Sequence, residues 1–152
     1  MQNIKFRAFS LKTNDWVYGY YAKFRNFKNE IYECIIPMDK ETGEAYMENI
    51  STFAEGSLGQ FIGFCDKNGK EIYAGDIVRI LYTDWASKSD NDPRTLDEYL
   101  KDIAKIGVIE WDKFYPQYHI HFMDKDNYGL LNYGEYGYID VIGNVFQNKD
   151  LL

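Results

Sequence analysis

Hydrophobic and polar positions alternate along three stretches near the N-terminus. Residues 4–9 (IKFRAF) alternate apolar with basic side chains, and residues 16–24 (WVYGYYAKF) are rich in aromatic side chains. A polar cluster at 12–15 separates them, and residues 30–37 (EIYECIIP) end at a proline. A period of two with β-branched and aromatic residues indicates strands. We therefore predict a hairpin from the first two stretches, followed by a third strand.

Residues 61–80 (FIGFCDKNGKEIYAGDIVRI) hold the densest set of turn signals. Asn68-Gly69 between two short apolar runs predicts a hairpin with a type I′ turn, which needs positive φ at both residues. Gly75 and Asp76 predict a second tight turn, in which the Asp76 side chain bonds its own backbone two residues on. The glycine spacing matches neither a phosphate-binding loop nor an EF-hand. We therefore expect these four residues to be structural.

The C-terminal half continues in strands. Residues 106–114, 117–124 and 138–146 have strand patterns, and residues 127–137 form a Tyr/Gly-rich loop or ragged hairpin. One helix interrupts the series near 93–104. Asp-Pro at its start suits a helix N-terminus, and apolar residues then recur at i, i+3, i+4 and i+7.

Together these elements predict a mainly β protein. We expect a β-rich pseudobarrel or sandwich of about seven to nine short strands, with one inserted helix near 93–104. A chain of 152 residues suits a single β-rich domain over 1–152.

Several motifs resemble those of the YopX family of phage and prophage proteins. They are the central DKNGKEIYAGDIVRI, the opening IKFRAF with WVYG, the strand GVIEWD and the closing DVIGNVFQNKDLL. The resemblance implies a mostly β pseudobarrel, a phage or prophage origin, self-association and no established biochemical activity. It divides the chain into an N-terminal hairpin region (1–55) and a signature region (58–152) with a variable insertion (84–105).

Composition places the protein among ordinary globular chains. Hydrophobic residues make up 45% and charged residues 27%. No apolar run approaches the ~20 residues of a membrane span, and the N-terminus lacks a secretory pattern. Cys34 and Cys65 have no paired spacing, so we expect reduced thiols and a cytoplasmic location in a bacterial host cell.

The aromatic content is higher than a core of this size needs. The chain has 14 Tyr, 10 Phe and 3 Trp, which favours a tyrosine-rich interface. We expect a homo-oligomer, or a complex with a phage or host protein, and no membrane partner. The candidate partner-binding residues are Trp16, Tyr18, Tyr20, Tyr128, Tyr133 and Tyr136.

Charge is unevenly distributed along the chain. Residues 1–28 carry a net charge of +5, which leaves −12 for the remainder of a chain with net charge −7. Lys5, Arg7, Lys23 and Arg25 lie among aromatic residues, a combination that suits single-stranded nucleic acid. The alternative is that these bases pair with the acidic remainder, within the chain or across a subunit interface. The acidic total makes nucleic acid the less expected partner.

Catalytic patterns are sparse. No nucleophile elbow and no Cys–His motif occurs, so we expect a non-enzymatic protein without a cofactor. His119 and His121 point to one face of a strand, and a metal-binding protein or metalloenzyme using this pair is an alternative. The competing interpretation is two histidines on a solvated strand face.

Overall fold

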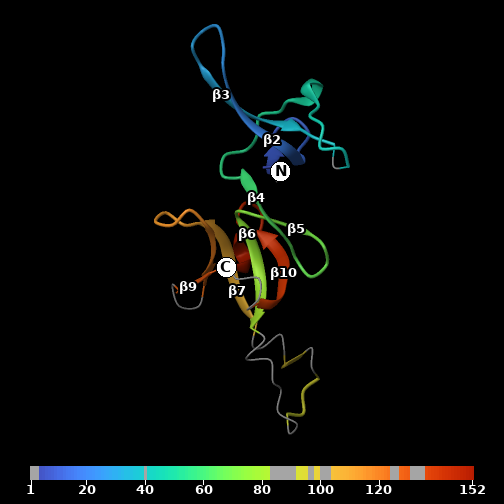
Figure 1. Cartoon of the computed structure of the whole chain (residues 1–152), viewed down its shortest axis with the longest axis vertical. Helices are drawn as coiled ribbons and strands as arrows, with labels where there is room; N and C mark the ends of the chain where they lie inside the picture. The colour runs from blue at the N-terminus through green and yellow to red at the C-terminus, as the bar shows by residue number, and fades with distance from the viewer. Residues whose placement is uncertain are drawn as a thin grey trace. The chain divides into compact units, whose positions relative to one another are not determined.

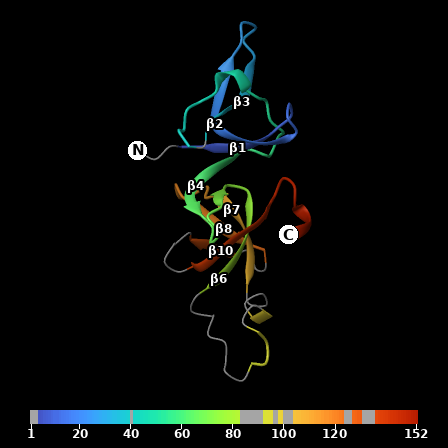
Figure 2. The same ribbon diagram turned by 90° about the vertical axis from the view of Figure 1, so that its right-hand side faces the viewer.

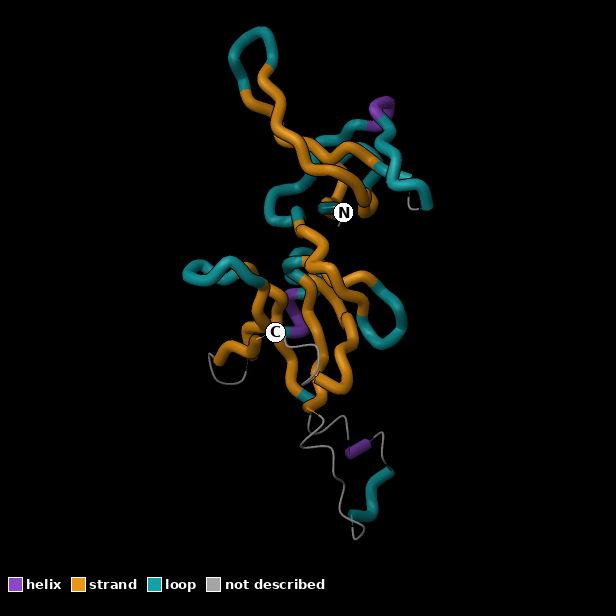
Figure 3. The backbone as a smooth tube through the Cα atoms, in the orientation of Figure 1, coloured by secondary structure: helices purple, strands orange, loops and turns teal. Residues whose placement is uncertain are grey.

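The computed structural model describes residues 4–39, 41–82, 92–95, 98–99, 104–123, 127–130 and 136–152. The chain is mainly β, as predicted, and strands dominate the trace in Figure 3. The strands are β1 (Phe6–Ser10), β2 (Asp15–Arg25), β3 (Ile31–Pro37), β4 (Gly59–Cys65), β5 (Glu71–Tyr73), β6 (Asp76–Tyr82), β7 (Lys105–Trp111), β8 (Tyr118–Phe122), β9 (Asn127–Leu130) and β10 (Tyr136–Asn144). Two short 3-10 helices are η1 (Met47–Asn49) and η3 (Lys149–Leu151). Strand β9 lies where the sequence indicated a loop or ragged hairpin.

The chain divides into two compact units, Met1–Gly63 and Phe64–Leu152. Strand β4 crosses the boundary between them. Each unit is described below by itself, and the single-domain organisation expected from the sequence stays a prediction.

The first unit is built on an antiparallel meander of β1, β2 and β3. The β1–β2 ladder runs from Phe6↔Gly19 to Ser10↔Asp15, which confirms the predicted hairpin. Strands β2 and β3 pair without interruption from Gly19↔Pro37 to Arg25↔Ile31. Their hairpin extends well beyond the other strands of the unit (Figure 1).

A fourth segment covers the open side of this meander. Ile35 and Ser51 exchange backbone hydrogen bonds of 3.0 and 3.1 Å, and the Ala54 N–H donates to the Phe9 carbonyl at 2.9 Å. Residues 51–54 therefore connect β3 to β1. Ala8 and Ile35 are fully buried beneath this connection and form part of the small core.

The second unit holds an antiparallel sheet with strand order β10-β6-β7-β8-β9. Figure 2 shows β6, β7, β8 and β10 side by side. Most residues of β6 are buried, which explains its nearly unbroken apolar sequence. The buried apolar residues of this unit are Ile72, Tyr73, Ile77, Val78, Ile80, Leu81, Val108, Ile109, Ile120, Phe122, Ile139 and Val141.

The hairpin predicted at Asn68-Gly69 is present, but its turn is not type I′. Only Gly69 has positive φ (80°), and its N–H donates to the Asp66 carbonyl at 3.0 Å. The Asp66 carboxylate accepts hydrogen bonds from the N–H groups of Asn68, Lys70 and Val141 at 2.8, 2.9 and 3.1 Å. An aspartate side chain therefore shapes the turn and ties it to β10.

The second predicted turn is also present. Gly75 has φ of 83°, and its N–H donates to the Ile109 carbonyl. Asp76 is fully buried, and its carboxylate accepts from the Tyr73 N–H at 2.8 Å, three residues back rather than two residues on. The carboxylate thus closes the turn between β5 and β6 from its C-terminal side.

The predicted helix at 93–104 falls largely outside the described residues. Within it, Glu98 and Tyr99 are helical, and the Tyr99 N–H donates to the Thr95 carbonyl at 3.0 Å.

Candidate binding groove and aromatic hairpin tips

A groove of about 430 Å³ opens on the first unit. Strand β2 contributes three consecutive lining residues, and Pro37 at the end of β3 and Met38 line the groove beside them, with the Met38 N–H donating to the Tyr18 carbonyl at 3.1 Å. The lining residues are Ser10, Lys12, Thr13, Trp16, Val17, Tyr18, Pro37, Met38, Asn49 and Ser51. Five of these ten residues are aromatic or aliphatic, and Lys12 is the charged residue among them.

The floor of the groove is made of buried hydroxyl groups. The Oγ atoms of Ser10 and Ser51 lie 2.6 Å apart, and both residues are buried. Ser10 Oγ also accepts from the N–H groups of Lys12 and Thr13 at 3.2 and 3.1 Å. These bonds fix the turn that follows β1, which carries the rim of the groove.

Trp16 is held in place from two sides. Its ring meets Phe9 edge to face, with centroids 5.8 Å apart and an interplanar angle of 83°. The guanidinium carbon of Arg7 lies 4.7 Å from the Trp16 ring centroid, and Arg7 itself is buried. Because the indole is packed before any partner arrives, little side-chain entropy is lost when a partner contacts it.

The six predicted partner-binding residues have different surroundings. Trp16 and Tyr18 line the groove. Tyr20 lies on the same strand outside the lining set, and its hydroxyl donates to the Gly43 carbonyl at 2.8 Å, which anchors the loop after β3. Tyr133 and the side chains of Tyr128 and Tyr136 lie outside the described part of the chain.

The basic residues of the N-terminal strands contact groups of their own unit. Lys5 Nζ lies 4.6 Å from the Phe61 ring centroid, and Lys23 Nζ lies 2.6 Å from the Glu33 carboxylate. The hydrogen bond to Glu33 raises the pKa of Lys23. Arg25 donates to Asn29 Oδ1 at 2.6 Å. Lys23 is thus paired with an acid of its own unit, Arg7 is buried against Trp16, and the nucleic-acid alternative stays a prediction.

The two histidines lie on β8 beside two carboxylates. His119 is buried, with Nδ1 3.4 Å from Asp112 Oδ2 and Nε2 3.8 Å from Glu110 Oε2. His121 Nδ1 lies 3.6 Å from the same Glu110 oxygen. Among the residues that the structure describes, no group of three or more His, Cys, Asp or Glu side chains is arranged to hold a metal ion. The metal alternative therefore stays a prediction.

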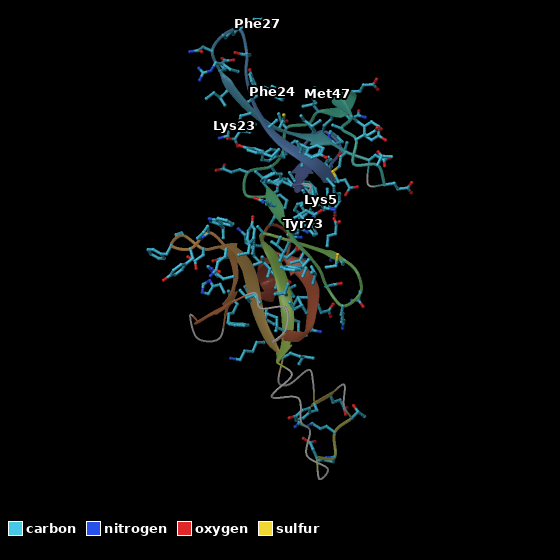
Figure 4. All side chains as sticks on the ribbon, in the orientation of Figure 1. Lys5, Lys23, Phe24, Phe27, Met47 and Tyr73 are labelled. Atoms are coloured by element: carbon cyan, nitrogen blue, oxygen red, sulfur yellow. The ribbon has the colours of Figure 1, made fainter. Side chains whose placement is uncertain are left out.

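The end of the β2–β3 hairpin exposes an apolar cluster that the sequence analysis did not identify. Phe27 is fully exposed at 112% of its reference surface, and Figure 4 shows it at the end of the hairpin. Phe24, Ile31 and Tyr32 are 44, 60 and 46% exposed. We call residues 24–32 the β2–β3 tip.

A smaller cluster occurs in the second unit, between β7 and β8. Phe114 and Tyr115 are 90 and 65% exposed, and their N–H groups donate to Asp112 Oδ1. Trp111, half exposed, meets the Tyr118 ring edge to face at 4.9 Å. We call residues 111–115 the β7–β8 tip.

The sequence contains a signal for both tips. In FRNFKNE and WDKFY an aromatic residue stands inside a run of turn-forming polar residues. A turn is at the surface, so an aromatic residue there is exposed unless another element covers it.

The comparisons with known proteins identify a structural neighbour and a family. The crystal structure of protein EF1440 from Enterococcus faecalis is 19% identical, with 100% of this chain and 99% of that chain covered and a TM-score of 0.47. The comparison with curated proteins found no match. In the described ranges, no helix is both long and apolar enough to cross a membrane. The family model described as YopX protein matches residues 5–152, and the chain therefore belongs to the YopX family.

Proposed function

We propose that this YopX protein is a phage- or prophage-encoded, non-enzymatic binding protein that acts through contacts with other polypeptides, either further copies of itself or a phage or host protein. The observation that carries the proposal is the groove between β2 and the end of β3. Its aromatic wall is already packed, and its floor is polar and hydrogen bonded.

The lining favours a polypeptide partner. Trp, Tyr and Met are enriched at protein interfaces, and binding energy concentrates where an apolar anchor enters a preformed pocket. Trp16, Tyr18 and Met38 provide such walls. The two aromatic tips support the same function, since contiguous exposed apolar side chains on a folded domain mark interaction sites.

A reducing compartment is part of the proposal. Cys34 and Cys65 are both free thiols, and burial raises the pKa of the Cys34 thiol, which keeps it protonated and unreactive. This supports the cytoplasm of a bacterial host cell as the place of action.

Site-specific photo-crosslinking tests the groove as a binding surface. A photoreactive amino acid at Lys12, an exposed residue on the rim, should give protein adducts of defined mass in host cells. The matched control is the same substitution at Lys70, an exposed lysine in the turn after β4. Adducts from Lys12 alone support the proposal. No adduct from Lys12, or the same adducts from both positions, would refute it.

A further inference from the structure

The β2–β3 tip is built as a rigid projection. Asn26 Oδ1 accepts from the N–H groups of Lys28 and Glu30 at 2.9 and 3.0 Å, and its Nδ2 donates to the Glu30 carboxylate and the Tyr32 hydroxyl. Asn29 adopts positive φ (68°), a conformation that asparagine tolerates in turns. Because one asparagine holds this turn in four bonds, the backbone that carries Phe27 has a fixed conformation.

The groove has room for this projection. A cavity of about 150 Å³ in a protein core is enough to take up benzene. At about 430 Å³, the groove admits the Phe27 ring together with parts of its neighbours on the tip. Its walls offer Trp16 and Tyr18 for ring contacts and Met38 as an adaptable surface.

The tip has no access to the groove of its own chain. The groove lies at the Trp16–Tyr18 end of β2, and the tip lies at the other end of the same strand. With a rise of about 3.3 Å per residue, the six residues of strand from Tyr18 to Phe24 separate the two by roughly 20 Å. The unbroken β2–β3 ladder prevents the hairpin from folding back. The groove that receives a tip must belong to another molecule.

Charge around the two surfaces is complementary. Three acidic residues, Asp15, Asp39 and Glu48, stand next to lining residues in the sequence. Two bases oppose them, Lys12 in the lining and Arg7 over the Trp16 ring, so the surroundings of the groove keep a net negative charge. Hydrogen bonds from the backbone N–H groups of Thr42 and Glu41 lower the pKa of Asp39, so it is charged at neutral pH.

The β2–β3 tip carries a net positive charge, because it contains two bases, Arg25 and Lys28, and one acid, Glu30. The β7–β8 tip has one acid and one base, Asp112 and Lys113, and therefore no net charge. Charge therefore favours the β2–β3 tip as the occupant of the groove.

We propose that the β2–β3 tip of one molecule docks into the groove of a second copy, with Phe27 between Trp16, Tyr18 and Met38. This rests on the proposed function and names the partner of the same groove. The contact is heterologous, because the two molecules contribute different surfaces. The pair then keeps one unused tip and one unused groove, so assembly continues into a ring or an open chain.

A single tip in a groove is a smaller contact than the ~800 Å² per partner of a standard interface. Association is therefore reversible, increases with protein concentration and weakens with salt.

Light scattering after size-exclusion chromatography, over a concentration series at low and high salt, measures the association. Phe27→Ala removes the tip's anchor, and Met38→Lys places a cation in the groove. Each variant should be monomeric at concentrations where the wild type associates, with affinity weakened at least about tenfold. Phe114→Ala is the matched control, since it removes a highly exposed phenylalanine from the other tip and should associate like the wild type.

Mixing the two variants gives the decisive result. Phe27→Ala keeps an intact groove and Met38→Lys keeps an intact tip, so the mixture should form a one-to-one dimer and nothing larger. Neither misfolding nor a symmetric interface produces this pattern. A monomeric wild type, a Phe114→Ala variant that loses association, or a mixture without dimer would each overturn the inference. Lys12 adducts with another protein, combined with a monomeric wild type, would leave the proposed function in place and remove only the self-docking.

Discussion

The hydroxyl oxygens of Ser10 and Ser51 lie 2.6 Å apart in the buried floor of the groove, although 41 residues separate them in the chain. Ser10 ends β1, and Ser51 belongs to the segment that connects β3 to β1. The contact therefore joins two parts of the unit at the place where a partner would bind.

Replacing Ser10 with alanine should destabilise the first unit. The Lys12 and Thr13 N–H groups would lose their acceptor, and the Ser51 hydroxyl would lose its neighbour. Unsatisfied buried polar groups cost about 1–3 kcal/mol, so we expect a loss in that range from urea unfolding followed by circular dichroism. Thr52→Ala, at an exposed side chain next to Ser51, is the control and should stay within about 0.5 kcal/mol. Equal losses of stability in both variants would mean that the buried hydroxyl pair stabilises the unit no more than an exposed side chain does.

Arg7 should act as a packing residue for Trp16. Arg7→Lys keeps the positive charge but loses the flat guanidinium that lies over the indole ring. We expect about 1–2 kcal/mol of lost stability and a changed Trp16 fluorescence spectrum. Lys5→Arg, at the neighbouring cation over Phe61, is the control, because the new guanidinium can stack in the same place. A fully stable Arg7→Lys variant would contradict the packing role.

Gly19 should be intolerant of any side chain. A Cβ at this position would lie 1.9 Å from the Ile36 carbonyl oxygen, in the opposing strand β3. Gly19→Ala must push β2 and β3 apart beside the groove, and overpacking of this kind costs about 1–3 kcal/mol or more. Gly69→Ala provides a contrast, since a Cβ there meets nothing within 4 Å and the cost arises from positive φ alone. Amide hydrogen exchange should show faster exchange along β2 and β3 in Gly19→Ala only.

Asp66 should make the second unit acid-sensitive. Burial opposes its ionisation, but hydrogen bonds from the backbone N–H groups of Val141, Lys70 and Asn68 outweigh burial and lower the pKa of the carboxyl. A folded pKa below the unfolded value of about 3.9 adds stability above that value, and this stability is lost as pH falls through the folded pKa.

Asp66→Asn tests this linkage. We expect the variant to be less stable at neutral pH by about 1–3 kcal/mol. The difference from wild type should shrink as pH falls below about 4, because the wild-type carboxyl then becomes protonated. Thermal unfolding at a series of pH values measures both the stability difference at neutral pH and its change with pH. A difference that stays constant with pH would show that ionisation of Asp66 contributes nothing.

The strands could be predicted because their patterns are local. IKFRAF, EIYECIIP and GDIVRI each alternate or run apolar within one segment, and each forms a strand. The turn at Asn68-Gly69 shows which features cannot be predicted from neighbouring residues alone. Dipeptide preference located the turn, but its geometry depends on a carboxylate that also binds Val141, 75 residues away. Contacts of that range leave no local pattern in the sequence.

The candidate site could be predicted only in part for the same reason. Trp16 and Tyr18 were selected as surface aromatics and line the groove, whereas Tyr20 on the same strand anchors a loop. Trp16, Tyr18 and Tyr20 share one face of β2, and only the neighbouring segments decide which of these rings lines a groove. The exposure of Phe27 could not be predicted from periodicity, because periodicity assigns aromatic residues to strands and a turn has no periodic pattern.

Asp66 and Val141, which share a hydrogen bond, enclose a segment of the chain that can accept inserted residues. Strands β6 and β7 lie between these two residues in the chain and pair directly with each other. Residues inserted between β6 and β7 therefore lengthen a connection whose two ends are already fixed by the sheet. Because each doubling of a flexible connection adds only about 0.6 kcal/mol of closure entropy, large insertions between these strands disturb the sheet very little. A new segment can therefore be added between β6 and β7 while the groove and both tips keep their geometry.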